Sequence, residues 1–308
     1  MTLEELLPRL RCPASGQALR RVGDTLVSED GSHAYGILDG VPDLRRAPER
    51  LRLDLPWYEP WEDLATLSLE PPAALAADDL PYHLDARLAS IPGDRGDGRW
   101  ILEIGCGARL CEPYFVKRGF HYVGSDADRR GPGPHVMLDA HNLPLADACF
   151  DLYFSLAVYE HLASPELAAV EAFRVLRPGG LFFGSAAFVY GFHDRASFHH
   201  MTHAALLVTF RSAGFREVRI WPDWAYTESI PEMSFRGAPG LPWRVAARAT
   251  LRVLEWSFTR TSKLGRTLAG KPRLDLAARR AETAGSLSFV ARKPGPGDRS
   301  APGGGYLR

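Results

Sequence analysis

The chain has 308 residues, a length that fits one main domain of about 200 residues with attached segments. Its 45% hydrophobic and 24% charged residues are typical of globular proteins and exclude a disordered, fibrous or collagen-like chain. Basic residues (Lys+Arg) and acidic residues (Asp+Glu) both total 37, so net charge alone indicates neither a nucleic acid nor a membrane as partner.

Three features predict a cytoplasmic protein. The four cysteines do not follow the spacing of a disulfide framework or a metal site, which favours a reducing compartment. The first residues carry acidic side chains where a signal peptide carries basic ones. The longest uncharged apolar stretch, Pro178–Phe192, is shorter than the roughly 18 residues that span a bilayer.

Two segments precede the first strong strand pattern. Residues 1–45 are expected to form a small β unit: a short helix over Leu3–Leu10 is followed by short alternating runs, separated by Asp-Gly turns at 30–31 and 39–40. Residues 46–98 are rich in proline and acidic side chains, with a helix expected near their end. We interpret them as a linker and lid.

From Trp100 onward, strand and helix patterns alternate. Helical segments are expected from about Glu112, over Ser164–Leu176 and over His203–Ser212. The strand-like runs between and around them are RWILEIG, HYVGSD, HVMLDA, FDLYFSL, GLFFGSAA and REVRIW. Such alternation predicts a doubly wound parallel sheet with helices on both faces, within a domain over 99–293.

A basic insertion interrupts this domain before its last strand-like run, Ser286–Arg292. We place the insertion at 222–284 and expect it to be helical. Residues 231–293 contain 13 basic and 4 acidic residues, a local charge of +9 that the neutral total conceals. The composition of residues 294–308 predicts a disordered tail.

The run LEIGCGA over 102–108 is the sharpest ligand-binding signal. It follows a strand-like run and precedes a helix, the place where a doubly wound sheet binds nucleotides. Gly105 and Gly107 allow a tight turn and a close approach of the backbone to a ligand. Asp126 ends the next strand-like run, from which a carboxylate accepts hydrogen bonds from ribose hydroxyls.

The same loop departs from a dinucleotide-binding fingerprint at two positions. The third glycine would fall at Leu110, and the acidic Glu103 would repel a pyrophosphate but not a cationic or amino-bearing ligand. These departures favour S-adenosylmethionine over NAD. A purely structural turn is the alternative.

Four motifs in register resemble the class I S-adenosylmethionine-dependent methyltransferases, of the type 11-like group. They are LEIGCG, GSDAD, LDAHNLPLADACFDLYFSLAVYEHL and RVLRPGG, within a match from Trp100 to Trp221 that Ser286–Arg292 completes. The resemblance implies an α/β, Rossmann-like seven-stranded sheet whose final strand is antiparallel. It also implies S-adenosylmethionine as cofactor, with no metal.

The resemblance further implies which positions bind the cofactor. The glycines of the loop lie against its methionine and ribose part, Asp126 binds the ribose, and Asp139 and Ala140 lie near the adenine. The predicted cofactor-binding residues are Glu103, Gly105, Cys106, Gly107, Asp126, Ala127, Asp139, Ala140, His141 and Ser155. Arg109 stands where many relatives have a glycine.

Residues 1–45 resemble the small zinc-ribbon-like domain that activates some tRNA and protein methyltransferases. A Cys-x-x-Cys pair starting at Cys12 would need a cysteine at Ser15, and no second pair follows. A structural zinc ion needs about four ligands, so we expect a degenerate, metal-free copy.

Three histidines are candidates for the catalytic base. His161 follows the fourth strand-like run, at the sheet edge where the methyl group should point, although packing around the cofactor is the alternative. His193 and His200 belong to a cluster after the fifth, which commonly covers the acceptor in the family. We weigh acceptor binding or base catalysis there against surface roles and a metal site.

The insertion contains a basic amphipathic helix, with Arg244, Arg248, Arg252 and Glu255 within one arc. One interpretation is a helix packed over the sheet with a single solvated stripe. The other is a helix that approaches an anionic lipid or a phosphorylated acceptor, in a peripheral contact with a membrane.

The sequence therefore predicts a methyltransferase acting on oxygen or nitrogen of a small-molecule or saccharide acceptor, which can be phosphorylated or lipid-linked. GFHDRASFHHMTHAAL resembles a branch that modifies glycans and cell-surface metabolites, with Ser197 and His200 where that branch usually has Asp and Arg. The alternatives are an RNA or protein methyltransferase with a fused activator-like domain and a catalytically silent scaffold. Nucleic acid is the less favoured partner, and the oligomeric state is left open.

Overall fold

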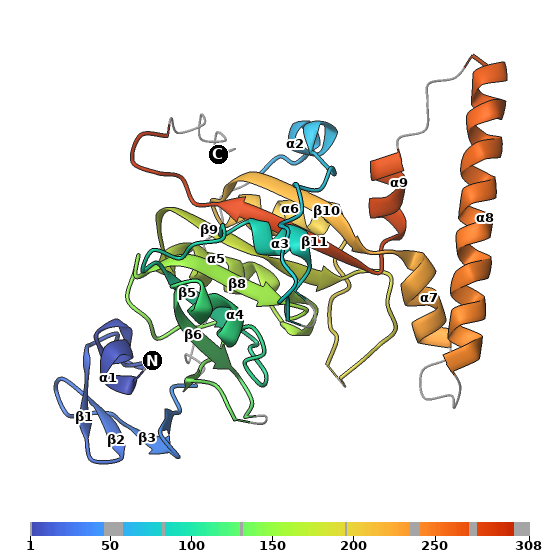
Figure 1. Cartoon of the computed structure of the whole chain (residues 1–308). Helices are drawn as coiled ribbons and strands as arrows, with labels where there is room; N and C mark the ends of the chain where they lie inside the picture. Colours follow the sequence, from blue (N-terminus) through green and yellow to red (C-terminus); the bar gives the residue numbers. More distant parts are fainter. Residues whose placement is uncertain are drawn as a thin grey trace.

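The structure, a computed structural model, has a seven-stranded sheet at its centre, a small N-terminal sheet at one end and a long helix at the other (Figure 1). It describes residues 2–45, 58–81, 84–129, 132–194, 196–234, 241–270 and 276–298. Residues 46–57 of the predicted linker and residues 299–308 of the predicted tail lie outside these ranges.

The central sheet has the strand order β10-β11-β9-β8-β5-β6-β7. Neighbouring strands from β9 to β7 are parallel, whereas β11 runs antiparallel to both β9 and β10. This confirms the predicted seven-stranded sheet with an antiparallel final strand. The strands are β5 (Trp100–Ile104), β6 (His121–Asp126), β7 (Val136–Met137), β8 (Phe150–Leu156), β9 (Leu176–Ala187), β10 (Arg216–Trp224) and β11 (Ser286–Arg292).

Each face of the sheet carries its own buried hydrophobic cluster. Helices α3 (Ala86–Ser90) and α4 (Glu112–Lys117) contribute to one cluster, and α5 (Pro165–Val175) and α6 (His203–Ser212) contribute to the other. Strand β5 alternates between them, because Ile101 belongs to the first and Leu102 to the second. A strand covered on both faces is therefore hydrophobic along its length, which explains the run WILEI.

Aromatic rings join the antiparallel end of the sheet to α6. Phe182 of β9 lies with its ring centroid 5.1 Å from that of Phe210 in α6 and 5.0 Å from that of Phe289 in β11. All three side chains are fully buried. Such edge-to-face contacts add to the burial of large apolar area, so they fix the last strand in the sheet.

The N-terminal unit is a four-stranded antiparallel sheet preceded by a short helix. Its strands are β1 (Leu19–Val22), β2 (Thr25–Ser28), β3 (Ala34–Leu38) and β4 (Val41–Pro42). The predicted helix over Leu3–Leu10 is only partly right: α1 (Leu3–Leu6) gives way to a 3-10 turn, η1 (Leu7–Arg9). Pro8 lies in that turn and has no N–H with which to continue the α-helical ladder.

This unit packs against the edge of the central domain. The Arg11 N–H donates to the Pro144 carbonyl at 2.7 Å, and the Ala146 N–H donates to the Arg9 carbonyl at 2.8 Å. Leu6 and Leu10 are buried in the same hydrophobic cluster as α5 and α6. The two sheets therefore share part of one core.

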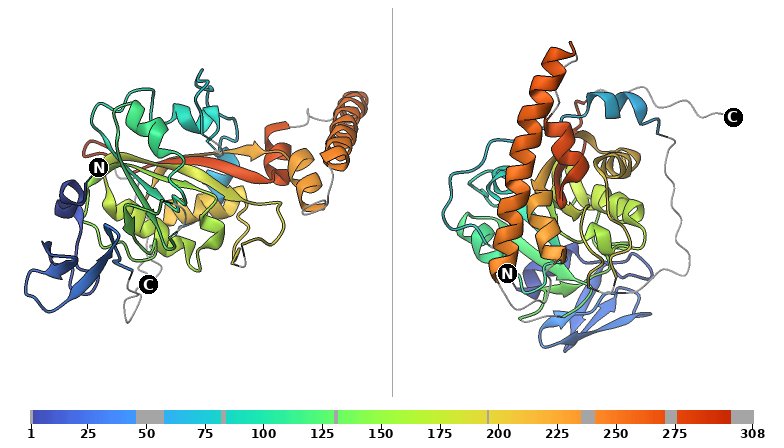
Figure 2. Two further views of the ribbon diagram at one scale, coloured as in Figure 1. Left: turned by 60° about the horizontal axis from the view of Figure 1, so that its bottom comes forward. Right: turned by 90° about the vertical axis from the view of Figure 1, so that its right-hand side faces the viewer.

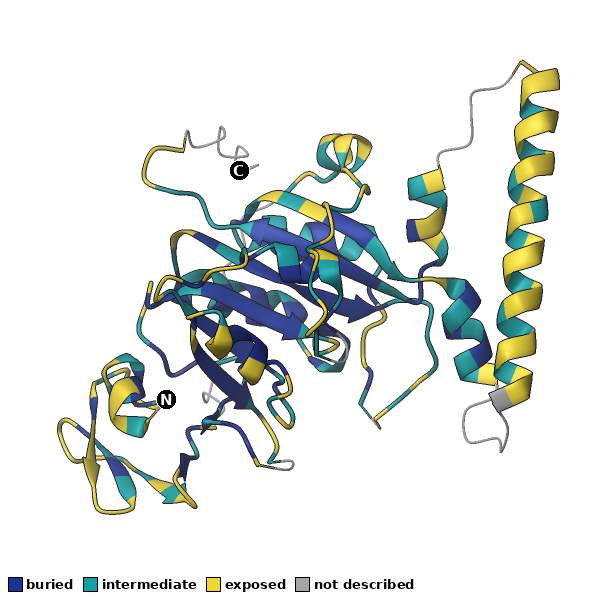
Figure 3. Ribbon diagram, viewed as in Figure 1, coloured by how far each residue is buried: buried dark blue, intermediate teal, exposed yellow. Residues whose placement is uncertain are grey.

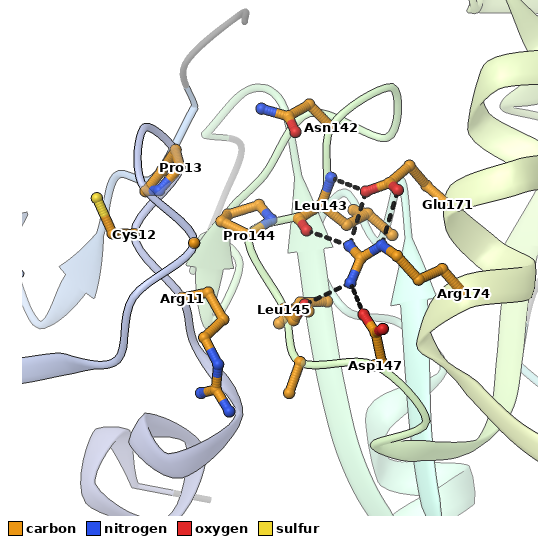
Figure 4. A pocket seen from close by; sticks show the side chains of 12 residues that line it. Arg11, Cys12, Pro13, Asn142, Leu143, Pro144, Leu145, Asp147, Glu171 and Arg174 are labelled. Atoms are coloured by element: carbon orange, nitrogen blue, oxygen red, sulfur yellow. Dashed lines mark hydrogen bonds and ion pairs between the residues drawn. The ribbon is translucent and has the colours of Figure 1, made fainter. Parts of the chain in front are cut away.

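A groove of about 500 Å³ lies between the two units, and Arg174 of α5 forms part of its wall (Figure 4). The Arg174 guanidinium donates to the carbonyl oxygens of Leu143, at 2.6 Å, and Leu145, at 2.7 Å. It also pairs with Glu171 and Asp147, and these carboxylates raise its pKa. These bonds hold the segment between β7 and β8 against α5.

The described part of the predicted lid contains two short helices. Helix α2 (Trp61–Thr66) is tied to α6 by the Asp63 carboxylate, which accepts from Arg211 Nε at 2.7 Å. A helix was expected near residues 82–90, and α3 begins at Ala86, after an N-cap formed by Asp85. Residues 82 and 83 lie outside the described ranges.

The described part of the insertion forms three helices between β10 and β11: α7 (Tyr226–Ser234), α8 (Leu241–Leu268) and α9 (Leu276–Thr283). The interpretation of a helix packed over the sheet is wrong, because α8 packs mainly on α7 and stands apart from the sheet (Figures 1 and 2). Most of α8 is exposed (Figure 3). No helix within the described ranges is both long and apolar enough to cross a membrane.

A substitution at Gly184 of β9 tests the pairing of β8 with β9. A Cβ built there would lie 1.9 Å from the Ser155 carbonyl oxygen on β8, whereas a Cβ at Gly36 of β3 would meet nothing within 4 Å. Gly184→Ala should therefore lower the free energy of unfolding by about 3 kcal/mol or more, because the strands must separate locally. Urea denaturation measures this.

Gly36→Ala is the matched control, and it should change the stability by less than about 1 kcal/mol. Equal effects of the two substitutions would contradict the pairing of β8 with β9.

Candidate active site

The candidate site lies at the carboxyl ends of the parallel strands. Strand β5 is central, with β6 on one side and β8 on the other. The chain continues from β5 to β6 on one side and later returns to β8 on the other, and open α/β sheets bind their ligands at such a point. The glycine-rich loop begins there, directly after Ile104.

Gly105 and Gly107 shape that loop for physical reasons. Gly105 has a φ of +73°, and a Cβ on it would lie 2.2 Å from Cγ2 of Val158. Gly107 has a φ of +50°, and a Cβ on it would meet nothing within 4 Å. The first glycine therefore lets the turn pack against the segment after β8, and the second leaves its outer side accessible to a ligand.

Asp126, at the end of β6, is held in place by two backbone N–H groups. Its Oδ2 accepts from the Gly107 N–H and its Oδ1 from the Asp128 N–H, both at 2.9 Å. The side chain is only half-buried. A carboxylate oxygen has more than one lone pair, so both oxygens can still accept hydrogen bonds from hydroxyl groups.

Glu103 lies beneath the loop and is almost fully buried. The Tyr122 hydroxyl donates a short hydrogen bond to its Oε2. Burial raises the pKa of Glu103 to about 8, so the carboxyl is largely protonated at neutral pH. Glu103 therefore carries no fixed negative charge with which to favour an amino-bearing ligand over a pyrophosphate.

Arg109 has the backbone conformation of the glycine that it replaces, with a φ of +55°. Its guanidinium pairs with Glu112 at 2.9 Å and contacts the His135 ring. A Cβ on Gly124 would lie 3.1 Å from Arg109 Cγ, which places the side chain over β6. The arginine thus preserves the turn and directs its charge toward Glu112.

A second group of predicted residues follows β7. Asp139 Oδ1 accepts from the His141 backbone N–H at 2.9 Å and from His141 Nδ1 at 2.6 Å, which lowers the pKa of the Asp139 carboxyl. His141 Nε2 accepts from the Ser164 N–H at 3.2 Å. These bonds fix the His141 tautomer, and Ala140 between the two is buried.

The other predicted cofactor residues lie at or directly after the ends of β5, β6 and β8. Cys106 is buried, and burial raises the pKa of its thiol. Ala127 is exposed, and its carbonyl accepts from Arg45 at the end of the N-terminal unit. Ser155, near the end of β8, is fully buried, and its hydroxyl has no hydrogen-bond partner among the described residues.

The three candidate histidines come together in space. The ring centroid of His193 lies 4.8 Å from that of His161 and 6.0 Å from that of His200. Nδ1 of His161 lies 3.2 Å from the Ala196 carbonyl oxygen, and Nδ1 of His193 lies 2.9 Å from that of Gly191. When these Nδ1 atoms donate, both Nε2 atoms carry lone pairs that can accept a proton.

Glu160 lies beside these histidines, although the sequence alone did not indicate it as a site residue. It is fully buried, and within the described ranges its two carboxyl oxygens have no hydrogen-bond partner. Its Oε1 lies 3.9 Å from His193 Nε2, and burial raises its pKa to about 7. The available signal was an acidic residue between Tyr159 and His161 directly after a buried strand.

Within the described ranges, one group of side chains has an arrangement suited to a metal: Glu160, His161 and His193. One donor atom from each of Glu160, His161 and His193 lies within 4.8 Å of the others. Donors bound to one zinc ion lie closer together, because each is about 2.0–2.2 Å from the metal. The side chains would have to move inward, and the absence of a metal stays a prediction.

Comparisons with known proteins match the part of the chain that contains the glycine-rich loop. A family model described as "Methyltransferase domain" matches residues 102–184. An uncharacterized methyltransferase of Mycobacterium ulcerans (strain Agy99) is 35% identical over 119 residues, which cover 35% of this chain and 46% of the relative. One of Mycolicibacterium paratuberculosis is 28% identical over 208 residues, covering 61% and 79%. The chain spans about half the length of the first of these relatives.

Solved structures are also similar at low identity. The complex between the Haloferax volcanii Trm112 methyltransferase activator and a methyltransferase gives 18% identity over 67% of this chain and 87% of that chain, with a TM-score of 0.43. A S-adenosylmethionine-dependent methyltransferase from Archaeoglobus fulgidus gives 15% identity over 68% and 92%, with a TM-score of 0.44. TM-scores this low add no argument about function.

The strand order and the glycine-rich loop define an α/β domain of the class I methyltransferase type. Residues 102–184, from β5 to β9, match the model of a methyltransferase domain. The family model does not extend to residues 1–45, so the zinc-ribbon-like character of the N-terminal unit stays a prediction.

Burial of Glu160 predicts a pH-dependent stability. Its pKa is about 7 in the folded protein against 4.5 for the free side chain, so folding favours the protonated form. That stabilisation is complete below pH 4.5 and is lost as the pH rises through 7. Relative to Glu160→Gln, the wild type should lose about 2–3 kcal/mol of unfolding free energy between pH 5 and pH 8.

Chemical denaturation at the two pH values measures this difference. Glu29→Gln, at an exposed position, is the matched control and should follow the wild type. If Glu160→Gln and the wild type lost stability in parallel, the carboxyl would not be buried as described.

Proposed function

We propose that the protein transfers a methyl group from S-adenosylmethionine to an oxygen or nitrogen atom of a small-molecule or saccharide acceptor. The observation that carries the proposal is the pairing of the Gly107 N–H with Asp126 at the carboxyl end of β5, within the segment that matches the methyltransferase family. This pairing brings a carboxylate and an open glycine loop together at one end of the sheet.

The residues present fit the cofactor. Asp126 has lone pairs available for the ribose hydroxyls, and the open side of Gly107 leaves room for the ribose and methionine part. Asp139 and buried Ala140 would border the adenine. When bound, the sulfonium supplies an electrophilic methyl group, so the chain needs no nucleophile of its own.

The histidine group is the proposed acceptor end of the site. Methyl transfer is an in-line displacement, in which the protein aligns the acceptor, excludes water and removes a proton from a weakly nucleophilic hydroxyl. His161 and His193 can take that proton at Nε2. Glu160, 3.9 Å from His193 Nε2, would stabilise the resulting positive charge. Burial lowers the pKa of His200, which keeps this ring neutral and able to accept a hydrogen bond.

One observation favours an RNA or protein acceptor as a second candidate. Arg45, at the end of the N-terminal unit, donates to the carbonyl of Ala127 beside Asp126. The unit therefore adjoins the proposed cofactor site, where an activator-like domain could stabilise the loop. The small-molecule acceptor remains the first proposal, because Glu160, His161 and His193 form a compact group rather than a broad surface, with Glu160 buried and both histidines half-buried.

Calorimetry of S-adenosylmethionine and S-adenosylhomocysteine binding tests the cofactor site. We expect micromolar binding of both ligands, weakened at least about tenfold in Asp126→Ala because two charge-assisted hydrogen bonds are lost. Asp128→Ala removes a carboxylate two residues along the chain and is the matched control, with near wild-type affinity. If the folded wild type bound neither ligand, the methyl-transfer proposal would be wrong, and a catalytically silent scaffold would be the remaining hypothesis.

Transfer of a labelled methyl group distinguishes the acceptors. We expect incorporation into members of a panel of small hydroxyl and amino compounds and saccharides, with at least about a hundredfold loss in His193→Gln while cofactor affinity is kept. Incorporation only into bulk RNA, falling steeply with salt, or only into protein would support the second candidate instead.

A further inference from the structure

Helix α8 turns its main arginine stripe toward the protein. Arg244 pairs with Glu232 of α7 at 2.9 Å, and Arg252 pairs with Glu228 of α7 at 3.3 Å. Arg248, between them along the same stripe, is only partly exposed. With about 3.6 residues per turn, the residues of this stripe lie on one side of the helix. The two glutamates of α7 thus fix the orientation of α8.

The side of α8 that faces away from α7 carries large exposed apolar side chains, with threonines among them. Trp243 is 66% exposed, Val253 62%, Leu254 58% and Leu264 62%. These positions lie opposite the arginine stripe on the helix. The exposed large apolar side chains of α8 are Trp243, Val245, Val253, Leu254, Trp256, Phe258, Leu264 and Leu268. An apolar surface this long on one helix marks an interaction site.

The exposed charges of α8 are all positive. Arg252, Arg260 and Lys263 are exposed, and the guanidinium of Arg260 lies over the Trp256 ring, 4.3 Å from its centroid. The helix has one acidic residue, Glu255, which lies on the arginine stripe and is half-buried. The apolar face is therefore bordered by basic groups and by no exposed carboxylate of this helix.

We propose that α8 lies flat on an anionic lipid bilayer, with its outer apolar side chains in the interface and Arg260 and Lys263 at the headgroups. Tryptophan and leucine on one side of a helix with basic residues beside them are the composition that binds such surfaces. Six basic residues on α8, from Arg244 to Arg266, keep the helix at the surface. The inference does not depend on the methyl-transfer proposal.

Charge complementarity favours the bilayer over a second copy of this chain. Two α8 helices that met through their outer faces would bring like charges together, because both faces carry Arg260 and Lys263. Anionic headgroups neutralise the same charges and leave the tryptophan rings at the depth they prefer. An anionic lipid surface therefore accommodates both the apolar side chains and the basic groups of this face.

Vesicle flotation with the full-length protein tests the proposal. We expect binding to vesicles of phosphatidylglycerol and phosphatidylcholine, at least about tenfold stronger than to phosphatidylcholine alone. The double variant Leu254→Glu and Leu264→Glu should lose this binding. Leu38→Glu, at a residue of β3 that is 67% exposed, is the matched control and should bind as the wild type does. Far-UV circular dichroism checks that each variant is folded.

A second pair of variants separates charge from apolar contact. Arg260→Gln with Lys263→Gln should weaken vesicle binding by on the order of fivefold for each charge removed. Arg20→Gln with Arg95→Gln removes two exposed arginines elsewhere and should leave it unchanged. A folded wild type that does not bind the anionic vesicles would overturn the proposal. So would a dimer in sedimentation velocity that Leu254→Glu and Leu264→Glu dissociate without vesicles present, since the face would then bind a second copy.

Discussion

The hydrogen bond from the Gly107 N–H to Asp126 joins the ends of two neighbouring strands, and the candidate site depends on it. The loop can turn back over β5 because Gly105 leaves room for Val158 and accepts a positive φ. The bond in turn holds the Asp126 carboxylate beside the loop, at the end of β6. The buried Glu103 and Tyr122 support the loop from below. The turn forms without a glycine at position 109, since Arg109 adopts a positive φ and its side chain is directed toward Glu112.

The two functional proposals lie at the same end of the sheet. Tyr190 links them, because its ring lies 5.1 Å from that of His193 and 5.3 Å from that of Trp224, where β10 leads into α7. A Cβ on Gly191 would lie 3.6 Å from Met233 of α7. The histidine group and the helix that carries α8 are therefore neighbours. If both proposals hold, an acceptor with a lipid portion would reach the histidines from the bilayer surface.

The sequence predicted the central sheet well and the insertion poorly, for identifiable reasons. The runs WILEI and FDLYFSL are hydrophobic on both faces, so their burial and parallel pairing follow from local pattern alone. Glu160 could not be identified from the sequence, because its burial depends on packing between the segment after β8 and the residues that precede α6. The orientation of α8 depends on Glu228 and Glu232 of α7. The residue pattern of α8 alone does not reveal these partners. The charge on Glu103 was misjudged because its pKa depends on burial.

Hydrogen–deuterium exchange of the backbone amides, with and without S-adenosylhomocysteine, tests the placement of the site most directly. We expect slower exchange on ligand addition at residues 105–109, 126–128 and 139–141, because the ligand would cover the loop, the Asp126 carboxylate and the segment after β7. Slower exchange confined to the groove beside Arg11 and Arg174, or no change in a protein that binds the ligand, would contradict the placement of the site.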